Sequence, residues 1–92
     1  MVTIVVKRKE QLENKEIGNI IRQHRKVLGY SREVFISEPI EDGLLPEDWI
    51  SEKSLSNIEL GYNLPSIFTL KKISIALQID FPDLITEIDQ YL

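Results

Sequence analysis

The chain has 92 residues, of which 42% are hydrophobic and 28% charged, the composition of one small globular domain with a single core. It contains no cysteine, which excludes disulfides and cysteine-ligated metal sites and favours a reducing, cytoplasmic location. No apolar run approaches the roughly 20 residues that span a bilayer, so we expect no membrane partner.

The charges are distributed unevenly along the chain, and this matters more than the net charge of −4. Residues 1–33 contain eight basic and four acidic side chains, a net charge of +4. Residues 34–92 contain three basic and eleven acidic side chains, a net charge of −8. A molecule of this kind can present a positive face despite its negative total. The acidic net charge therefore does not exclude nucleic acid as the partner.

Residues 2–6, VTIVV, are apolar and mostly β-branched, a composition that favours a β-strand. An unpaired strand edge is a template for another strand. Three interpretations stay open: the strand pairs with a second copy, it pairs with a strand in residues 37–50, or the segment is an irregular arm that contacts the core. We assign residues 1–13 to this N-terminal strand or arm, and residues 14–92 to the folded domain.

The first expected helix covers residues 14–28, where isoleucines recur at helical spacing and basic residues lie on the opposite side. Asn14 is a suitable N-cap for this helix. Gly29 is suited to end it, because glycine adopts the left-handed backbone conformation at little cost.

The second expected helix begins at Arg32, because the hydroxyl of Ser31 can cap it by accepting a hydrogen bond from a free backbone N–H. We expect Val34 and Phe35 to face the core. Proline lacks the N–H that a helix interior requires, so Pro39 is predicted to end this helix.

Residues 37–50, SEPIEDGLLPEDWI, form an irregular acidic insert before the third expected helix. Pro46 suits the first position of a single helical turn. Four large apolar side chains are too hydrophobic for a solvated loop, so at least some should pack on the core or on a partner protein. They are Leu44, Leu45, Trp49 and Ile50.

The stretch from Ser51 to Ser66 predicts a short helix, a glycine stop and the start of another helix. Ser51 can cap the short helix, and Leu55 and Ile58 give it one apolar face. Gly61 is placed where a helix ends in the left-handed conformation. So short a helix is not stable alone in water. It must be held against other helices, which leaves its polar edge for contact with a partner.

Two further helices are expected after this stretch. The helix capped by Ser66 should bury Ile67, Leu70, Ile73 and Leu77. The last helix should begin at Asp80 or Phe81, with Pro82 in its first turn. Its inward residues are predicted to be Leu84, Ile85, Ile88 and Leu92.

Read together, two segments resemble the helix-turn-helix domain of the phage-repressor-like (XRE) transcriptional regulators. They are IGNIIRQHRKVLGYSREVF and SEKSLSNIELGYNLPSIFTLKKISIAL. The resemblance covers residues 17–88 apart from the insert, and its most specific parts are the arginine of the first helix, the run LSNIELG and the following PSIFTLKKI. It implies an all-α domain of five helices, with helices two and three as the helix-turn-helix and helix three in the major groove of DNA.

The resemblance also implies which residues contact DNA. The start of the second helix holds a phosphate, the leading turns of the third helix read base edges, and the loop after it touches the DNA backbone. A lysine there can donate to guanine, and an asparagine can make a two-point contact with adenine. The alternative is that the third helix merely presents a solvated face. The implied DNA-binding residues are Arg32, Glu52, Lys53, Ser54, Asn57, Tyr62 and Asn63.

Two further positions are implied to be structural. By resemblance, Arg25 of the first helix and Glu59 of the third form a buried ion pair that joins these helices, in preference to contacting DNA. The chain departs from the family in the turn, which normally has three or four residues, whereas residues 39–50 separate the two helices here. The acidic side chains of this insert would be repelled by phosphate if they faced the duplex.

The sequence shows no catalytic constellation. The single histidine, His24, lies on the polar side of a basic helix, and no phosphate-binding loop or nucleophile motif occurs. We therefore expect neither an enzyme nor a cofactor. The leading hypothesis is a sequence-specific double-stranded DNA-binding regulator of the repressor type that acts as a homodimer. The alternative is a protein-interaction module of the same fold, an antitoxin or adaptor, which binds a protein partner through residues 37–50 and the N-terminal strand.

Overall fold

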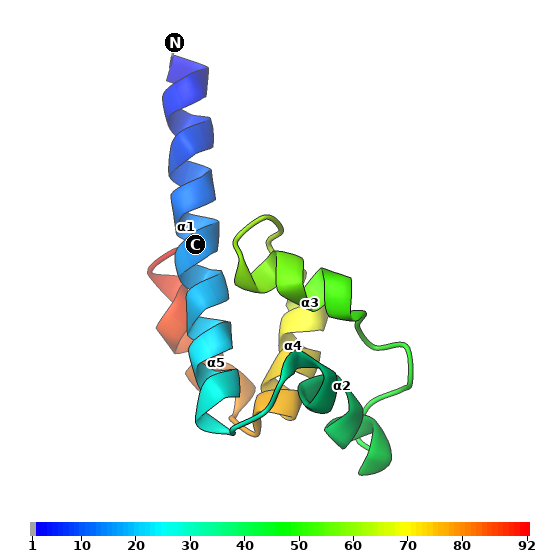
Figure 1. The fold of residues 1–92 in the computed structure, drawn as a ribbon. Coiled ribbons are helices and arrows are strands. Elements are labelled where there is room, and N and C mark those ends of the chain that lie inside the picture. The colour runs from blue at the N-terminus through cyan, green and yellow to red at the C-terminus, as the bar shows by residue number, and fades with distance from the viewer. Residues whose placement is uncertain (1) are drawn as a thin grey trace.

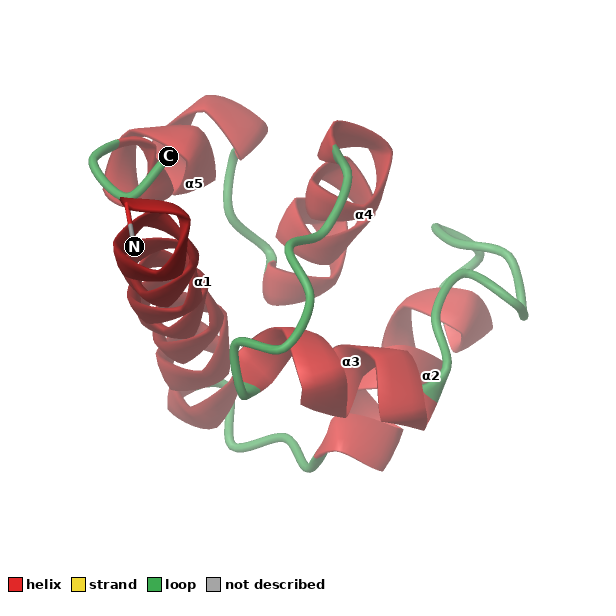
Figure 2. Cartoon of the chain, turned by 90° about the horizontal axis from the view of Figure 1, so that it is seen from above, coloured by secondary structure: helices red, strands yellow, loops and turns green. Residues whose placement is uncertain are grey.

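The computed structural model describes the backbone of residues 2–92 and the side chains of residues 14–92. The described backbone forms no strand, and α5 packs against α1 and α4 while α2 and α3 pack on each other (Figure 1 and Figure 2). The predicted all-α fold of five helices is therefore confirmed. The helices are α1 (Val2–Val27), α2 (Arg32–Glu41), α3 (Glu52–Glu59), α4 (Ile67–Leu77) and α5 (Phe81–Asp89).

The N-terminal strand predicted for residues 2–6 is wrong, because this segment is the first part of α1. Each β-branched residue costs a helix less than about 0.7 kcal/mol, and extending an existing helix adds one hydrogen bond for each residue fixed. Asn14, the expected N-cap, accordingly lies inside the helix. In Figure 1 the first half of α1 projects beyond the other helices. The predicted domain boundary between residues 13 and 14 lies within α1, which is continuous there. Whether the two parts are separate domains stays a prediction.

All five helices contribute side chains to one core. The spacing predicted from the sequence places isoleucines of α1, Phe35 of α2 and leucines of the later helices in it, and these positions are confirmed. The fully buried apolar side chains, each with at most 1% of its surface exposed, are Ile17, Ile21, Phe35, Leu55, Ile73, Leu84 and Ile88.

Some residues predicted to face inward do not. Val34, Ile67 and Leu92 have exposed fractions of 38%, 59% and 64%. Val34 and Ile67 lie in the first turn of their helices, and Leu92 follows the end of α5. The helical spacing of apolar residues continues to these positions, but they lie at or beyond the ends of their helices, outside the part that packs on the core.

The expected N-caps of three helices are confirmed. Ser31, Ser51 and Ser66 each accept a hydrogen bond from the backbone N–H three residues later, at 3.2, 3.0 and 3.2 Å. This satisfies one of the free donors at each helix start. The glycine stops are also confirmed, since Gly29 and Gly61 have φ angles of +76° and +85°.

Two glycines let α1 and α3 approach closely. A Cβ atom on Gly18 of α1 would collide with the backbone carbonyls of Ile58 and Glu59. A Cβ atom on Gly61 would collide with the backbone of Lys15. These two close approaches hold the C-terminal end of α3 against α1. A helix as short as α3 needs such contacts to be stable.

Pro39 does not end α2, which continues to Glu41. A proline within a helix removes one hydrogen bond, but here the ring is buried and its carbonyl accepts from the backbone N–H groups of Leu44 and Leu45, at 2.8 and 3.2 Å. Burial of the ring and these bonds offset the loss. The prediction that Pro39 stops the helix is therefore wrong by one turn.

The insert is anchored by its tryptophan. Trp49 has an exposed fraction of 6%, packs edge-on against Phe35 with ring centroids 6.0 Å apart, and donates its indole N–H to the carbonyl of Ile36 at 3.0 Å. Leu45 is also buried, whereas Leu44 is 60% exposed. The expectation that part of the insert packs on the core is confirmed. A turn closed by the backbone bond from Trp49 to Pro46 leads into α3.

Candidate nucleic-acid interface

The leading turn of α3 is polar and exposed. Its backbone is fixed by the cap, in which the Ser54 N–H donates to Ser51 Oγ at 3.0 Å and the Ser51 hydroxyl donates to Ser54 Oγ at 2.9 Å. Glu52, Lys53 and Ser54 are all exposed. Within the side chains that the structure describes, Glu52 and Lys53 form no ion pair. A fixed backbone with outward-facing polar side chains is suited to contacting an external surface.

The remaining predicted contacts lie one turn further along α3 and in the loop after it. Asn57 is half-buried, and its carbonyl accepts from the backbone N–H groups of Tyr62 and Asn63, at 2.9 and 3.4 Å. The loop is therefore folded back against the end of α3. Tyr62 is 71% exposed, and Asn63 is also at the surface. The structure thus places six of the seven predicted residues on α3 and the loop that follows it.

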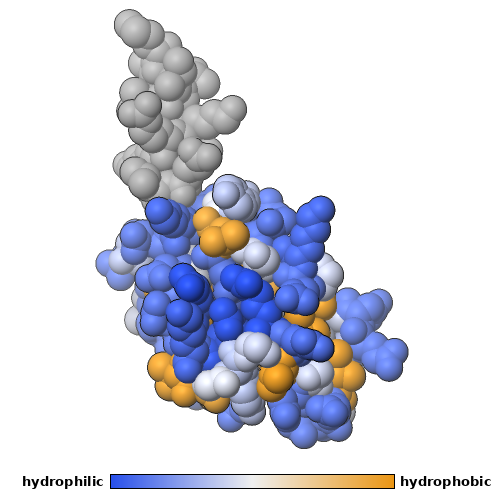
Figure 3. Space-filling view, in the orientation of Figure 1, coloured by the Kyte–Doolittle hydropathy of each residue, from blue (hydrophilic) through white to orange (hydrophobic). Residues whose placement is uncertain are grey.

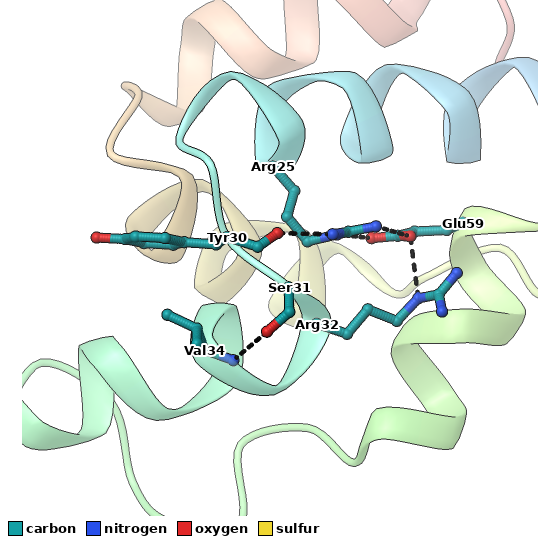
Figure 4. A network of polar contacts seen from close by, with 6 residues as sticks. All are labelled: Arg25, Tyr30, Ser31, Arg32, Val34 and Glu59. Carbon is teal, nitrogen blue, oxygen red and sulfur yellow. Dashed lines mark hydrogen bonds and ion pairs between the residues drawn. The ribbon is translucent and has the colours of Figure 1, made fainter.

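Beneath this surface, Arg25 and Glu59 form the ion pair implied by the resemblance (Figure 4). Arg25 Nε donates to Glu59 Oε2 at 2.7 Å, and Nη2 donates to Oε1 at 2.9 Å. The hydrogen bonds to Glu59 raise the pKa of Arg25 above its ordinary value. Arg25 Nη1 donates to the carbonyl of Tyr30 at 2.7 Å. The two residues are 7% and 4% exposed, so the two-point bond joins α1 to α3 inside the protein, and the bond to Tyr30 adds the α1–α2 turn.

Arg32, the seventh predicted residue, lies at the start of α2, as the resemblance implied. Its Nε donates to Glu59 Oε1 at 3.1 Å, so that Glu59 accepts from two arginines. Its side chain is 30% exposed. In Figure 4 the terminal nitrogens of Arg32 point away from Glu59. The sequence did not predict this bond, because its two residues are 27 apart in the chain and meet only through the packing of α2 on α3.

The C-terminal end of the insert lies beside the start of α3. Asp48 lines an open hollow of about 360 Å³, together with Ser51 and Ser54 of the helix start and Asn63 of the following loop. Asp48 and Glu52 are both exposed, against the single positive charge of Lys53. Of the insert acids predicted to be repelled by phosphate, Asp48 therefore lies beside the polar turn of α3, whereas Glu38 and Asp42 line a separate hollow with residues of α4.

A further polar contact between side chains lies outside this region. His24 Nε2 and the carboxylate of Glu87 are 2.8 Å apart and connect α1 with α5. The sequence analysis placed His24 on a polar surface without predicting its partner. Among the described residues, no group of three or more metal-ligating side chains comes together, and no helix is long and apolar enough to cross a membrane.

Residues 48–84 match the model of a family described as helix-turn-helix. The match covers the end of the insert, all of α3 and α4, and the first turn of α5. It confirms the resemblance inferred from the sequence and supports a DNA-binding helix-turn-helix regulator in general terms. No curated protein and no solved structure matches the chain.

Proposed function

We propose that the chain is a sequence-specific double-stranded DNA-binding transcriptional regulator of the repressor type, and the match of residues 48–84 to a helix-turn-helix family supports this proposal. It binds as a homodimer to a two-fold-related site, with one α3 helix of each copy in the major groove. No cofactor is required for this activity.

The observation that carries the proposal is the rigid support of an exposed polar helix. α3 has only eight residues, yet Glu59 at its C-terminal end is held by a two-point bond from Arg25, and Ser51 caps its start. A reading helix must keep its side chains in register with base edges, which requires a fixed backbone. No element of the described structure covers the polar turn, so it is accessible to a duplex.

The proposed contacts follow from the chemistry of the exposed side chains. Lys53 donates to a guanine edge, Asn57 contacts an adenine, and Glu52 can accept from a cytosine amino group. Ser54 contacts either base edges or phosphate. Tyr62, Asn63 and the terminal nitrogens of Arg32 contact the DNA backbone and set the orientation of the helix.

Selection of bound sequences from a random duplex pool tests this function directly. We expect enrichment of a two-fold-related site, and an affinity that falls by about 0.9 log units per phosphate contact for each tenfold increase in salt. Absence of any enriched sequence at low salt, or an affinity that does not respond to salt, would contradict the proposal.

Replacement of Lys53 by alanine tests the role of α3. The expected loss for the selected site is about 1–3 kcal/mol of binding free energy, with an unchanged fold, because the side chain is exposed. Lys71→Ala is the matched control, since it removes the same charge from α4, where the ammonium lies 5.8 Å from the centre of the Phe81 ring. Equal losses for the two variants would mean that α3 does not read the sequence.

The alternative function, a protein-interaction module, retains less support. Its proposed N-terminal strand is helical, and the insert buries Leu45 and Trp49 in the protein's own core, which leaves Leu44 as its exposed large apolar side chain. This alternative would be favoured if Lys53→Ala left DNA binding unchanged and the duplex selection with the wild-type protein enriched no sequence.

A further inference from the structure

The connection between α3 and α4 has apolar side chains at the surface. Residues 60–68 form the segment that we call the apolar connection. Its most exposed members are aromatic, with exposed fractions of 77% for Phe68 and 71% for Tyr62. Figure 3 shows a small hydrophobic area near where the connection leaves α3, beside hydrophilic surface. The exposed apolar residues are Leu60, Tyr62, Leu64, Ile67 and Phe68.

The apolar connection is also free of charge. No acidic or basic residue occurs between Glu59 and Lys71, although residues 34–92 as a whole have a net charge of −8. A second copy approaching most of this half of the chain would meet like charges and be repelled. At the apolar connection two copies can meet without this repulsion, so the charge distribution favours this surface for self-association.

The exposed apolar area of the connection is a substantial part of what an interface requires. An aromatic side chain can bury roughly 150–250 Å², and most of that area is exposed on Phe68, whereas Tyr62 is assigned to the DNA backbone and is not counted here. With the three aliphatic side chains, the connection offers several hundred Å², whereas a standard interface buries about 800 Å² on each partner. Patches of this size on soluble proteins commonly mark interaction sites.

We propose that the apolar connection is the surface through which two copies of this chain associate. The inference rests on the proposed function for its homodimer and identifies the part of the fold that forms it. Because the connection directly follows α3, two copies joined here hold their α3 helices on either side of a two-fold axis. Neighbouring half-sites lie about 34–36 Å apart on one face of DNA, so such an arrangement is required of a dimer that binds both.

The test is the dissociation constant of the dimer, measured by sedimentation for the full chain and for the double variant I67Q/F68Q. Neither residue belongs to the proposed DNA contacts, and the replacements leave the net charge unchanged. We expect a wild-type dimer and at least a tenfold rise in the dissociation constant for the variant. The matched control is Val27→Gln, since Val27 is 85% exposed at the end of α1 and outside the connection. This control should dimerise as the wild type does.

Three outcomes would overturn the interface: a wild-type monomer at all accessible concentrations, an unchanged dissociation constant for I67Q/F68Q, or equal weakening by Val27→Gln. A thermal melt of each variant separates loss of association from loss of fold, because the replaced side chains are largely exposed and wild-type melting is expected.

Binding to a duplex with a single half-site distinguishes this inference from the proposed function. Wild-type half-site affinity in I67Q/F68Q, with loss of the tighter binding to a double site, supports both. Specific DNA binding by a wild-type monomer would overturn the interface and leave the function standing. Dimerisation through the connection without specific DNA binding would overturn the proposed function and leave the interface standing.

Discussion

The two connections on either side of α3 are built in opposite ways. The insert before it is acidic and turns its large apolar side chains inward, with Trp49 and Leu45 only 6% and 8% exposed. The apolar connection after it contains no charge and turns its aromatic side chains outward, with Phe68 77% exposed. The large apolar side chains of the first connection therefore contribute to folding, and its carboxylates are expected to repel polyanions. The second connection contributes to folding through its buried Gly61 and Pro65, whereas its aromatic side chains are exposed and available to the proposed partner.

Both connections depend on α3 being held in place, and removal of its anchor should have the largest effect. Glu59→Ala strands the buried guanidinium of Arg25, which costs about 3–5 kcal/mol. The measurement is the free energy of unfolding from denaturant titration at neutral pH. Glu87→Ala is the control, because it breaks the exposed contact with His24 and should cost less than about 1 kcal/mol. Equal stability of the Glu59 variant and the wild type would contradict the buried pair.

A matched pair of aromatic replacements tests the contrast itself. Trp49→Ala should cost about 3–5 kcal/mol of unfolding free energy, because it leaves a cavity beside Phe35 and removes the bond to Ile36. Phe68→Ala, at an exposed position, should change stability by no more than about 0.5 kcal/mol in the monomer. Similar losses for both variants would mean that the two connections do not differ in how they pack.

The parts of the fold that the sequence predicted are those governed by local rules. Ser31, Ser51 and Ser66 cap helices because each precedes an apolar periodic run, and Gly29 and Gly61 end helices because they tolerate positive φ. The existence of the Arg25–Glu59 pair was implied by a family pattern. Such features require only a few neighbouring residues or a known resemblance, so they can be predicted before the structure is seen.

The failures are positions where packing prevails over local preference. The strand propensity of residues 2–6 yields to extension of α1, and burial of Pro39 lets α2 continue past it. The bond from Arg32 to Glu59 joins residues 27 apart in sequence and depends on how α2 meets α3. Of the DNA-contact set on α3, the exposure of Glu52, Lys53 and Ser54 agrees with the proposed role, whereas contact with DNA stays a prediction.

The smallest expected effect concerns the charge of the insert. Asp48 lies beside Ser51 and Ser54 at the start of α3, so its carboxylate opposes the approach of phosphate. Asp48→Asn should therefore raise affinity for the selected duplex about two- to fivefold at low salt, and the gain should shrink as salt screens the interaction. Asp83→Asn makes the same charge change on exposed α5 and should give a smaller gain. If both variants bind alike, only the net charge matters, and the insert does not face the duplex.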